Sequence, residues 1–155
     1  MLCLGAQSAM AQARIGFVDS DRLMREAAPA VKAQQRLEKE FEQRDKELQR
    51  MAQELQVMQE EIERNSLTMV ESEKRDKERA FNELNRDFQR KQREFREDLN
   101  QRRNEELATV LERANVAIKQ IAEAEKFDIV LQEAVFASPR VDITEKVIKA
   151  LGETR

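Results

Sequence analysis

The chain has 155 residues and a formal net charge of −3, and 38% of its residues are charged while only 5% are aromatic. This near balance of mixed charges argues against a nucleic-acid-binding protein. The absence of histidine and the single cysteine exclude a Cys/His nucleophile pair and a histidine-supported metal site. A single compact globule is also disfavoured, because about half of the chain is Ala, Glu, Lys, Leu or Arg, as in long coiled-coil helices.

The first 13 residues, MLCLGAQSAMAQA, are uncharged and mostly small or apolar. They contain two small-x-small triplets, 9–11 and 11–13, of the kind that a leader peptidase accepts. We interpret residues 1–13 as the remnant of a signal peptide, whose removal would leave a mature chain without cysteine. The alternative is a disordered N-terminus of a cytosolic protein.

The segment RIGFV (14–18) alternates in polarity and predicts a short strand with Ile15 and Phe17 on one face. Asp19 and the two residues after it are candidate caps for a short helix. Pro29 would end this helix and suits the first turn of the next one.

Residues 31–121 are predicted to form an antiparallel helical hairpin whose tip lies near 65–70. Apolar residues on the first half recur at three- and four-residue spacing, with one gap at Arg44, and those on the second half repeat this rhythm in mirror image about Thr68. The mirror pairs are Leu55 with Phe81, Leu48 with Phe88, Phe41 with Phe95, and Leu37 with Leu99. A chain that folds back at Thr68 would bury each pair, which one continuous helix cannot do.

The turn itself is predicted from its local chemistry. Asn65 and Ser66 are poor residues for the interior of a helix. Thr68 and Glu71 have the spacing of a capping box, so Thr68 is the expected cap of the returning helix.

Two further strands, FDIVLQ (127–132) and AVFA (134–137), are expected to form a β-hairpin with a turn near Glu133. Asp142 and Glu145 then have capping-box spacing before a C-terminal helix. Residues 14–30 and 122–155 would thus form a small β-containing body, which makes the fold class α+β. Three short strands leave bare sheet edges, so we expect several copies to associate through this body. The oligomerisation residues expected from these strands are Ile15, Phe17, Phe127, Ile129, Leu131, Val135 and Phe136.

The order RIGFVDSDRLMREA, a charged hairpin, KFDIVLQEAVFA and DITEKVIKAL resembles the Skp (OmpH) family of periplasmic chaperones, over residues 14–151. The resemblance implies a homotrimer in which short strands form a central body. It also implies that three helical arms enclose a cavity for unfolded outer-membrane proteins, without ATP or any cofactor. Well-known members are basic, whereas this chain has a pI of about 5.3. This difference shifts the expected client contacts from electrostatic to apolar ones.

The mirror symmetry fails near the tip, where several apolar residues lack an apolar partner. Methionine is an adaptable side chain that suits promiscuous surfaces. The resulting candidates for client binding are Val57, Met58, Ile62, Leu67, Met69 and Val70. The alternative is that they pack in the seam beneath lysine and arginine stems.

A second candidate surface is a basic stripe, because Arg86, Arg90 and Arg93 share one helical face. It could contact the phosphates of lipopolysaccharide, an anionic membrane surface or acidic client segments. Carboxylates are interspersed along it, so a solvated face of ion pairs is the alternative.

No pattern predicts an enzyme, a cofactor or a metal site. The three glycines, at 5, 16 and 152, cannot form a phosphate-binding loop. Two other functions stay open: a structural periplasmic adaptor that docks on a folded partner, and a cytosolic hairpin chaperone of the prefoldin type.

Overall fold

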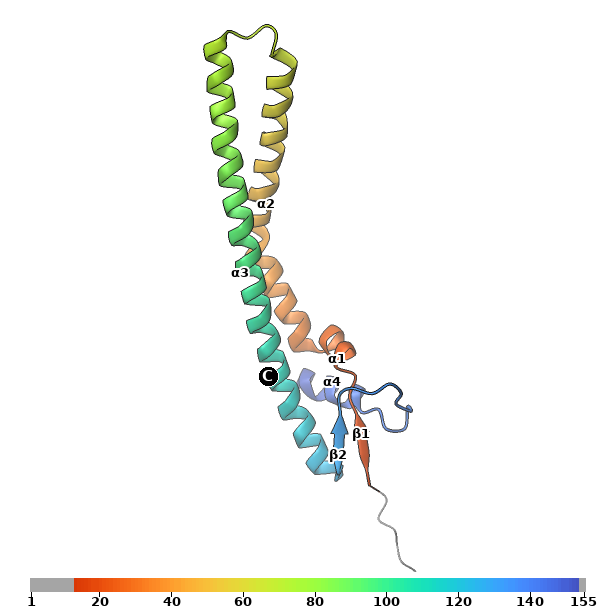
Figure 1. Cartoon of the computed structure of the whole chain (residues 1–155). Coiled ribbons are helices and arrows are strands. Elements are labelled where there is room, and N and C mark those ends of the chain that lie inside the picture. The colour runs from red at the N-terminus through yellow and green to blue at the C-terminus, as the bar shows by residue number, and fades with distance from the viewer. Residues whose placement is uncertain (1–12, 154–155) are drawn as a thin grey trace, which may run out of the picture. The chain divides into compact units, whose positions relative to one another are not determined.

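A computed structural model describes residues 13–153 of the chain. Its elements in chain order are β1 (Ile15–Phe17), α1 (Ser20–Glu26), α2 (Ala28–Asn65), α3 (Glu71–Glu125), β2 (Ile129–Leu131) and α4 (Thr144–Glu153) (Figure 1). Two long helices and a small sheet made from both ends of the chain confirm the predicted α+β class. The predicted signal-peptide remnant lies outside the described residues, apart from Ala13.

The chain divides into two compact units, which we call the terminal unit (up to residue 32 and from 108 onward) and the hairpin unit (33–107). The sequence had suggested an arm of residues 31–121. In the structure, residues 108–121 belong to the terminal unit, where Val110, Ala114, Ala117 and Ile118 are buried.

The sheet of the terminal unit has two parallel strands rather than the three strands predicted. Ile15 of β1 is in register with Ile129 of β2, and Phe17 is in register with Leu131. The other edge of β1 is used by residues 141–143. Phe17 N–H donates to the Val141 carbonyl (2.8 Å), and the Phe17 carbonyl accepts from Ile143 N–H (2.8 Å).

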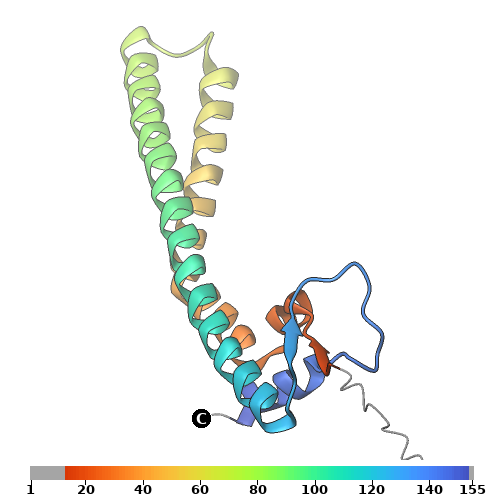
Figure 2. The same ribbon diagram turned by 60° about the horizontal axis from the view of Figure 1, so that its bottom comes forward.

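The predicted strand at 134–137 is wrong for this chain. The segment after β2 crosses over to the far side of β1, as the wide loop in Figure 2 shows, so residues 134–137 form a connection and do not fold back on β2. A β-strand requires backbone hydrogen bonds to a neighbouring strand. Within residues 13–153, residues 134–137 do not pair with any strand.

The small sheet turns its smaller residues inward. Gly16 and Val18 are buried, and a Cβ at Gly16 would lie only 3.2 Å from Cδ1 of Ile143 and 3.4 Å from a ring carbon of Phe127. Because side chains alternate along a strand, Ile15 and Phe17 are on the opposite face. The apolar face that the sequence predicted therefore points away from the core of the protomer.

Phe127 was expected to share a face with Ile129 and Leu131, but it lies on the inner side, against Gly16. The reason is the end of α3, where Lys126 has a φ of 57° and Phe127 N–H donates back to the Ala122 carbonyl (2.9 Å). This left-handed termination turns the chain before β2 begins, so strand alternation does not extend back to Phe127.

The helix caps of the terminal unit follow the sequence closely. The Asp19 carboxylate accepts from Arg22 N–H (2.9 Å) and caps α1, and Pro29 lies in the first turn of α2. Asp142 accepts from Thr144 N–H (2.8 Å) at the start of α4, as predicted. The other half of that capping box does not form, because Glu145 pairs with Arg22 at 2.7 Å.

The core of the terminal unit contains one fully buried hydroxyl among apolar side chains such as Leu23 and Val147. The Thr144 hydroxyl accepts from Asp19 N–H (2.8 Å) and donates to the Asp142 carboxylate (2.5 Å). This single side chain therefore links the cap of α1 to the cap of α4.

In the hairpin unit, α2 and α3 run antiparallel and are joined by the turn at 66–70 (Figure 1). This arrangement confirms the predicted reversal of the chain. Among the described residues, no helix combines the length and apolar character needed to cross a membrane.

Replacing Thr144 by Val should destabilise the terminal unit. The substitution keeps the shape but leaves the partly buried Asp19 N–H without its acceptor, at a cost of about 1–3 kcal/mol. Thermal unfolding followed by circular dichroism should give a lower midpoint for Thr144→Val. Thr144→Ser retains the hydroxyl and is the control; equal midpoints for the Val variant and the parent chain would contradict the inferred role.

Candidate functional site

The two helices of the hairpin meet at a pair of aromatic rings. Phe41 and Phe95 contact edge to face, with ring centroids 5.5 Å apart and planes at 86°, and Phe41 is 5% exposed. This contact is one of the predicted mirror pairs and is confirmed. The Arg44 guanidinium lies 5.5 Å from one ring centroid and 5.7 Å from the other, which explains the gap in the apolar seam at that position.

Ion pairs between α2 and α3 follow the same antiparallel register. Arg44 pairs with Asp98 at 2.7 Å, and Lys77 pairs with Glu61 at 3.0 Å nearer the tip. The other pairs between the helices join Arg36 to Glu106, Arg102 to Glu40, and Lys91 to Glu47. Charges thus link the two helices at several points along the hairpin.

These pairs shift the pKa values of the carboxylates involved. The hydrogen bond from Lys91 lowers the pKa of Glu47, and the hydrogen bond from Arg36 lowers the pKa of Glu106. The hydrogen bonds that Arg102 donates to the Glu40 carboxylate are the largest cause of the raised pKa of Arg102, and a bond that it donates to Glu105 adds to this. All of these groups keep their charge at neutral pH.

The turn at the tip differs from the predicted capping box. The Thr68 hydroxyl donates to the Asn65 carbonyl (3.2 Å), as does Met69 N–H (3.0 Å), so both serve the end of α2. The first hydrogen bond of the returning helix runs from Lys74 N–H to the Val70 carbonyl (3.1 Å). Val70 therefore occupies the cap position of α3, because Thr68 is engaged by the free carbonyls of the preceding helix.

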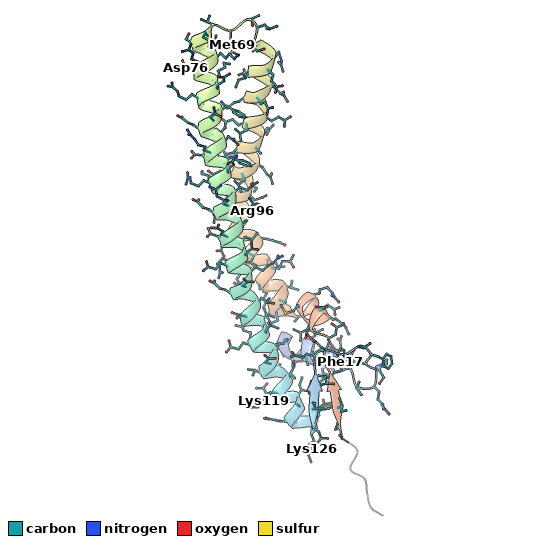
Figure 3. All side chains as sticks on the ribbon, viewed as in Figure 1. Phe17, Met69, Asp76, Arg96, Lys119 and Lys126 are labelled. Atoms are coloured by element: carbon teal, nitrogen blue, oxygen red, sulfur yellow. The ribbon has the colours of Figure 1, made fainter. Side chains whose placement is uncertain are left out.

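The candidate client-binding residues are unevenly exposed around this turn. Leu67 is 97% exposed, Val70 68% and Val57 53%, while Met58, Ile62 and Met69 are partly exposed. Met69 lies at the very end of the hairpin unit (Figure 3). These side chains are the ones that two helices alone leave uncovered.

Ile62 has an apolar neighbour that the mirror pattern missed. Ile62 and Phe81 line one shallow hollow of about 440 Å³, whose other walls include Glu63 and Glu78. Spacing alone could not reveal this, because Phe81 was already assigned as the partner of Leu55. The hollow has an apolar floor and acidic walls.

The basic stripe is partly neutralised on its own helix. Arg90 pairs with Asp87 at 3.2 Å and with Glu94 at 3.4 Å, and the hydrogen bond that it donates to Asp87 raises the pKa of Arg90. Arg86 and Arg93 are exposed on the same helix. This geometry favours a solvated ion-pair face at Arg90 over an anion site.

The candidate oligomerisation residues fall into three groups. Ile15, Ile129 and Leu131 are 42%, 48% and 40% exposed on the outer face of the sheet, and Phe17 is half-buried beside them. Val135 and Phe136 stand out from the following loop almost fully exposed. Phe127 lies inward, and the Arg14 guanidinium lies 4.6 Å from its ring centroid.

Sequence reasoning did not predict that apolar side chains are exposed on the part of α3 within the terminal unit. Leu111 is 39% exposed and Val116 is 54% exposed there. Val116 lies between the buried residues Ala114 and Ala117 but is not on their face of the helix. An apolar residue that falls outside the three- and four-residue spacing was the signal in the sequence that could have predicted its exposure.

Metal-ligating side chains do not gather in the described part of the chain. No cluster of three or more metal-ligating side chains occurs among residues 13–153. The carboxylates with shifted pKa values pair with lysine or arginine on the helix surface, which is the geometry of structural ion pairs.

We compared the chain with protein families, with characterised proteins and with solved structures. The family described as outer membrane protein (OmpH-like) matches residues 14–151. The chain belongs to the OmpH-like family. The chaperone protein Skp of Yersinia enterocolitica is 29% identical to it over 150 residues, which cover 96% of this chain and 92% of that relative. A crystal structure of an OmpH-like protein from Caulobacter crescentus has the same fold, with a TM-score of 0.73 over 97% of this chain and 90% of that one, at 20% identity.

Membership of the OmpH-like family confirms the resemblance predicted from the terminal motifs. The family is one of chaperones rather than a class of enzymes. The match spans both terminal motifs and the hairpin, so the whole described architecture of this OmpH-like chain is shared with the family.

Acid should weaken the hairpin of this OmpH-like chain, because carboxylates in the ion pairs between its helices have lowered pKa values. A carboxylate whose pKa is lowered on folding contributes stability above its unfolded pKa and loses it as the pH falls through the folded value. We therefore expect the thermal midpoint to be nearly flat above pH 4.5, the ordinary glutamate pKa, and to fall below it.

Thermal melts followed by circular dichroism at pH values from about 3 to about 7, which include the range in which glutamates titrate, would measure this fall in the midpoint. Glu47→Gln removes one of the shifted carboxylates and should reduce it, whereas Gln43→Ser on the same helix should not. A midpoint that rises in acid would contradict the assignment of these pairs as stabilising.

Proposed function

We propose that the chain is an ATP-independent periplasmic holdase that binds unfolded outer-membrane proteins and prevents their aggregation. The observation that carries the proposal is the set of apolar side chains left in solvent at the end of the hairpin, with Leu67 97% exposed. An exposed apolar cluster on a thin, charged hairpin suits contact with apolar segments of other chains. Family membership supports the same function.

The contacts proposed for clients are numerous and weak. The surface around Met58, Ile62 and Met69 offers flexible or shallow apolar contacts and lacks a deep pocket that would select one side chain. Several arms acting together would gain affinity through multivalency while the client stays mobile. Binding the unfolded form in this way withdraws it from aggregation by mass action.

We also propose that the arms are brought together by a homotrimer. The outer face of the sheet, with Ile15, Ile129 and Leu131 exposed, is apolar and continuous across the register. Val135 and Phe136 add a second exposed apolar segment directly after β2. Burial of both segments against copies of the same chain would cover the free edge of β2.

Replacing Met58, Leu67 and Met69 together by Ser should weaken the holdase. The loss of three apolar contacts should raise the chaperone concentration needed for half-maximal protection by on the order of tenfold. The measurement is light scattering as a urea-denatured outer-membrane barrel is diluted, without nucleotide.

Two outcomes of that assay are informative. The control, Gln43→Ser with Gln53→Ser, changes exposed polar residues of the same helix and should protect as well as the parent chain. Full protection by the triple variant with its helicity intact would contradict the assigned surface. A parent chain that gives no protection would instead favour the structural adaptor.

Replacing Val135 and Phe136 by Ser should shift the oligomer toward monomer, because the exposed apolar segment is removed while the core of the protomer is untouched. Analytical ultracentrifugation at micromolar concentration measures the change, and Val57→Ser in the hairpin should leave the mass unchanged. A parent chain that sediments as a monomer would contradict the proposed assembly.

A further inference from the structure

Both backbone groups of Arg14 and its side chain are held by residues at the end of α3 and just after it. Arg14 N–H donates to the Asp128 carboxylate at 2.6 Å, and Asp128 N–H donates to the Arg14 carbonyl at 2.8 Å. The Arg14 guanidinium pairs with Glu125 at 3.2 Å and covers the ring of Phe127. The segment after α3 thus fixes the chain immediately before β1 begins.

The hydrogen-bond acceptor of the Arg14 N–H is a charged carboxylate, whereas a backbone amide usually donates to a neutral carbonyl. Among the ion pairs of residues 13–153, Arg14 and Lys146 both go to Glu125 and none goes to Asp128. The charge of Asp128 is therefore left without a cationic partner in the described chain.

The sequence places a processing motif directly before this contact. Ala11-Gln12-Ala13 is a small-x-small triplet, and the bond after it joins Ala13 to Arg14. Hydrolysis of this bond by a leader peptidase consumes one water, leaves a carboxylate on Ala13 and leaves an α-amino group on Arg14. An α-amino group has a pKa of about 7.7–8.0 and so carries a proton at neutral pH.

We propose that Asp128 binds the α-ammonium group that Arg14 acquires when the predicted leader is removed by cleavage between Ala13 and Arg14. The nitrogen that donates to Asp128 at 2.6 Å becomes the positively charged terminus, so a neutral hydrogen bond becomes an ion pair without movement of the chain. The start of β1 is then tied to β2 more strongly in the processed protein than in its precursor.

The first experiment determines the N-terminus of the protein isolated from the cells that make it. Mass spectrometry of the intact chain should give Arg14 as its first residue. A chain that begins at Gln12, as cleavage after the other triplet would give, or that retains the leader would overturn the proposal.

The second experiment measures the ion pair by a double-mutant cycle. Asp128→Asn is made in the chain that begins at Arg14 and in a chain that retains Gln12 and Ala13 before it. The substitution should lower the thermal midpoint by on the order of 1–3 °C in the first chain and by clearly less in the second.

Glu125→Gln is the matched control, because its contact with the Arg14 side chain does not depend on the α-amino group. Its effect should be the same in both chains. An Asp128→Asn effect that is equal in both chains, or larger in the extended one, would overturn the role of Asp128.

Discussion

The edge-to-face contact of Phe41 with Phe95, covered by Arg44, holds the two helices of the hairpin in antiparallel register. Two helices can bury only the narrow stripes that face each other. Phe41 and Leu55 of α2 are buried in the seam of the hairpin, whereas Ile62 nearer the turn is partly exposed. A two-helix arm therefore keeps its distal apolar residues in water, which is the physical basis of the proposed client surface.

Ion pairs between α2 and α3 add to the stabilisation that the narrow apolar seam provides. Pairs such as Arg44 with Asp98 and Lys77 with Glu61 cross between the helices and are compatible with only one register. Such exposed pairs are individually weak and are screened by salt. They specify how the helices align, and they do so without hiding the apolar residues near the tip.

The terminal unit has a well-buried core, but its two-stranded sheet leaves one apolar face exposed. Thr144 joins the caps of two helices inside that core, and Gly16 lets Ile143 approach β1 closely. The outer face, with Ile15 and Ile129, remains apolar and exposed. The terminal unit thus combines a packed core with an exposed apolar surface, and the proposed association between copies of the chain would bury that surface.

The sequence by itself determined the reversal of the chain near 65–70 and the caps at Asp19 and Asp142, because these follow from local spacing and capping chemistry. The family was indicated by the resemblance of its terminal motifs. The tertiary structure decided what spacing cannot encode. The chain after β2 crosses to the far edge of β1, so residues 134–137 are a loop, and Thr68 serves the preceding helix rather than the following one. Partner choice between segments distant in sequence depends on which backbone edges and carbonyls remain free after folding, and only the three-dimensional arrangement fixes that.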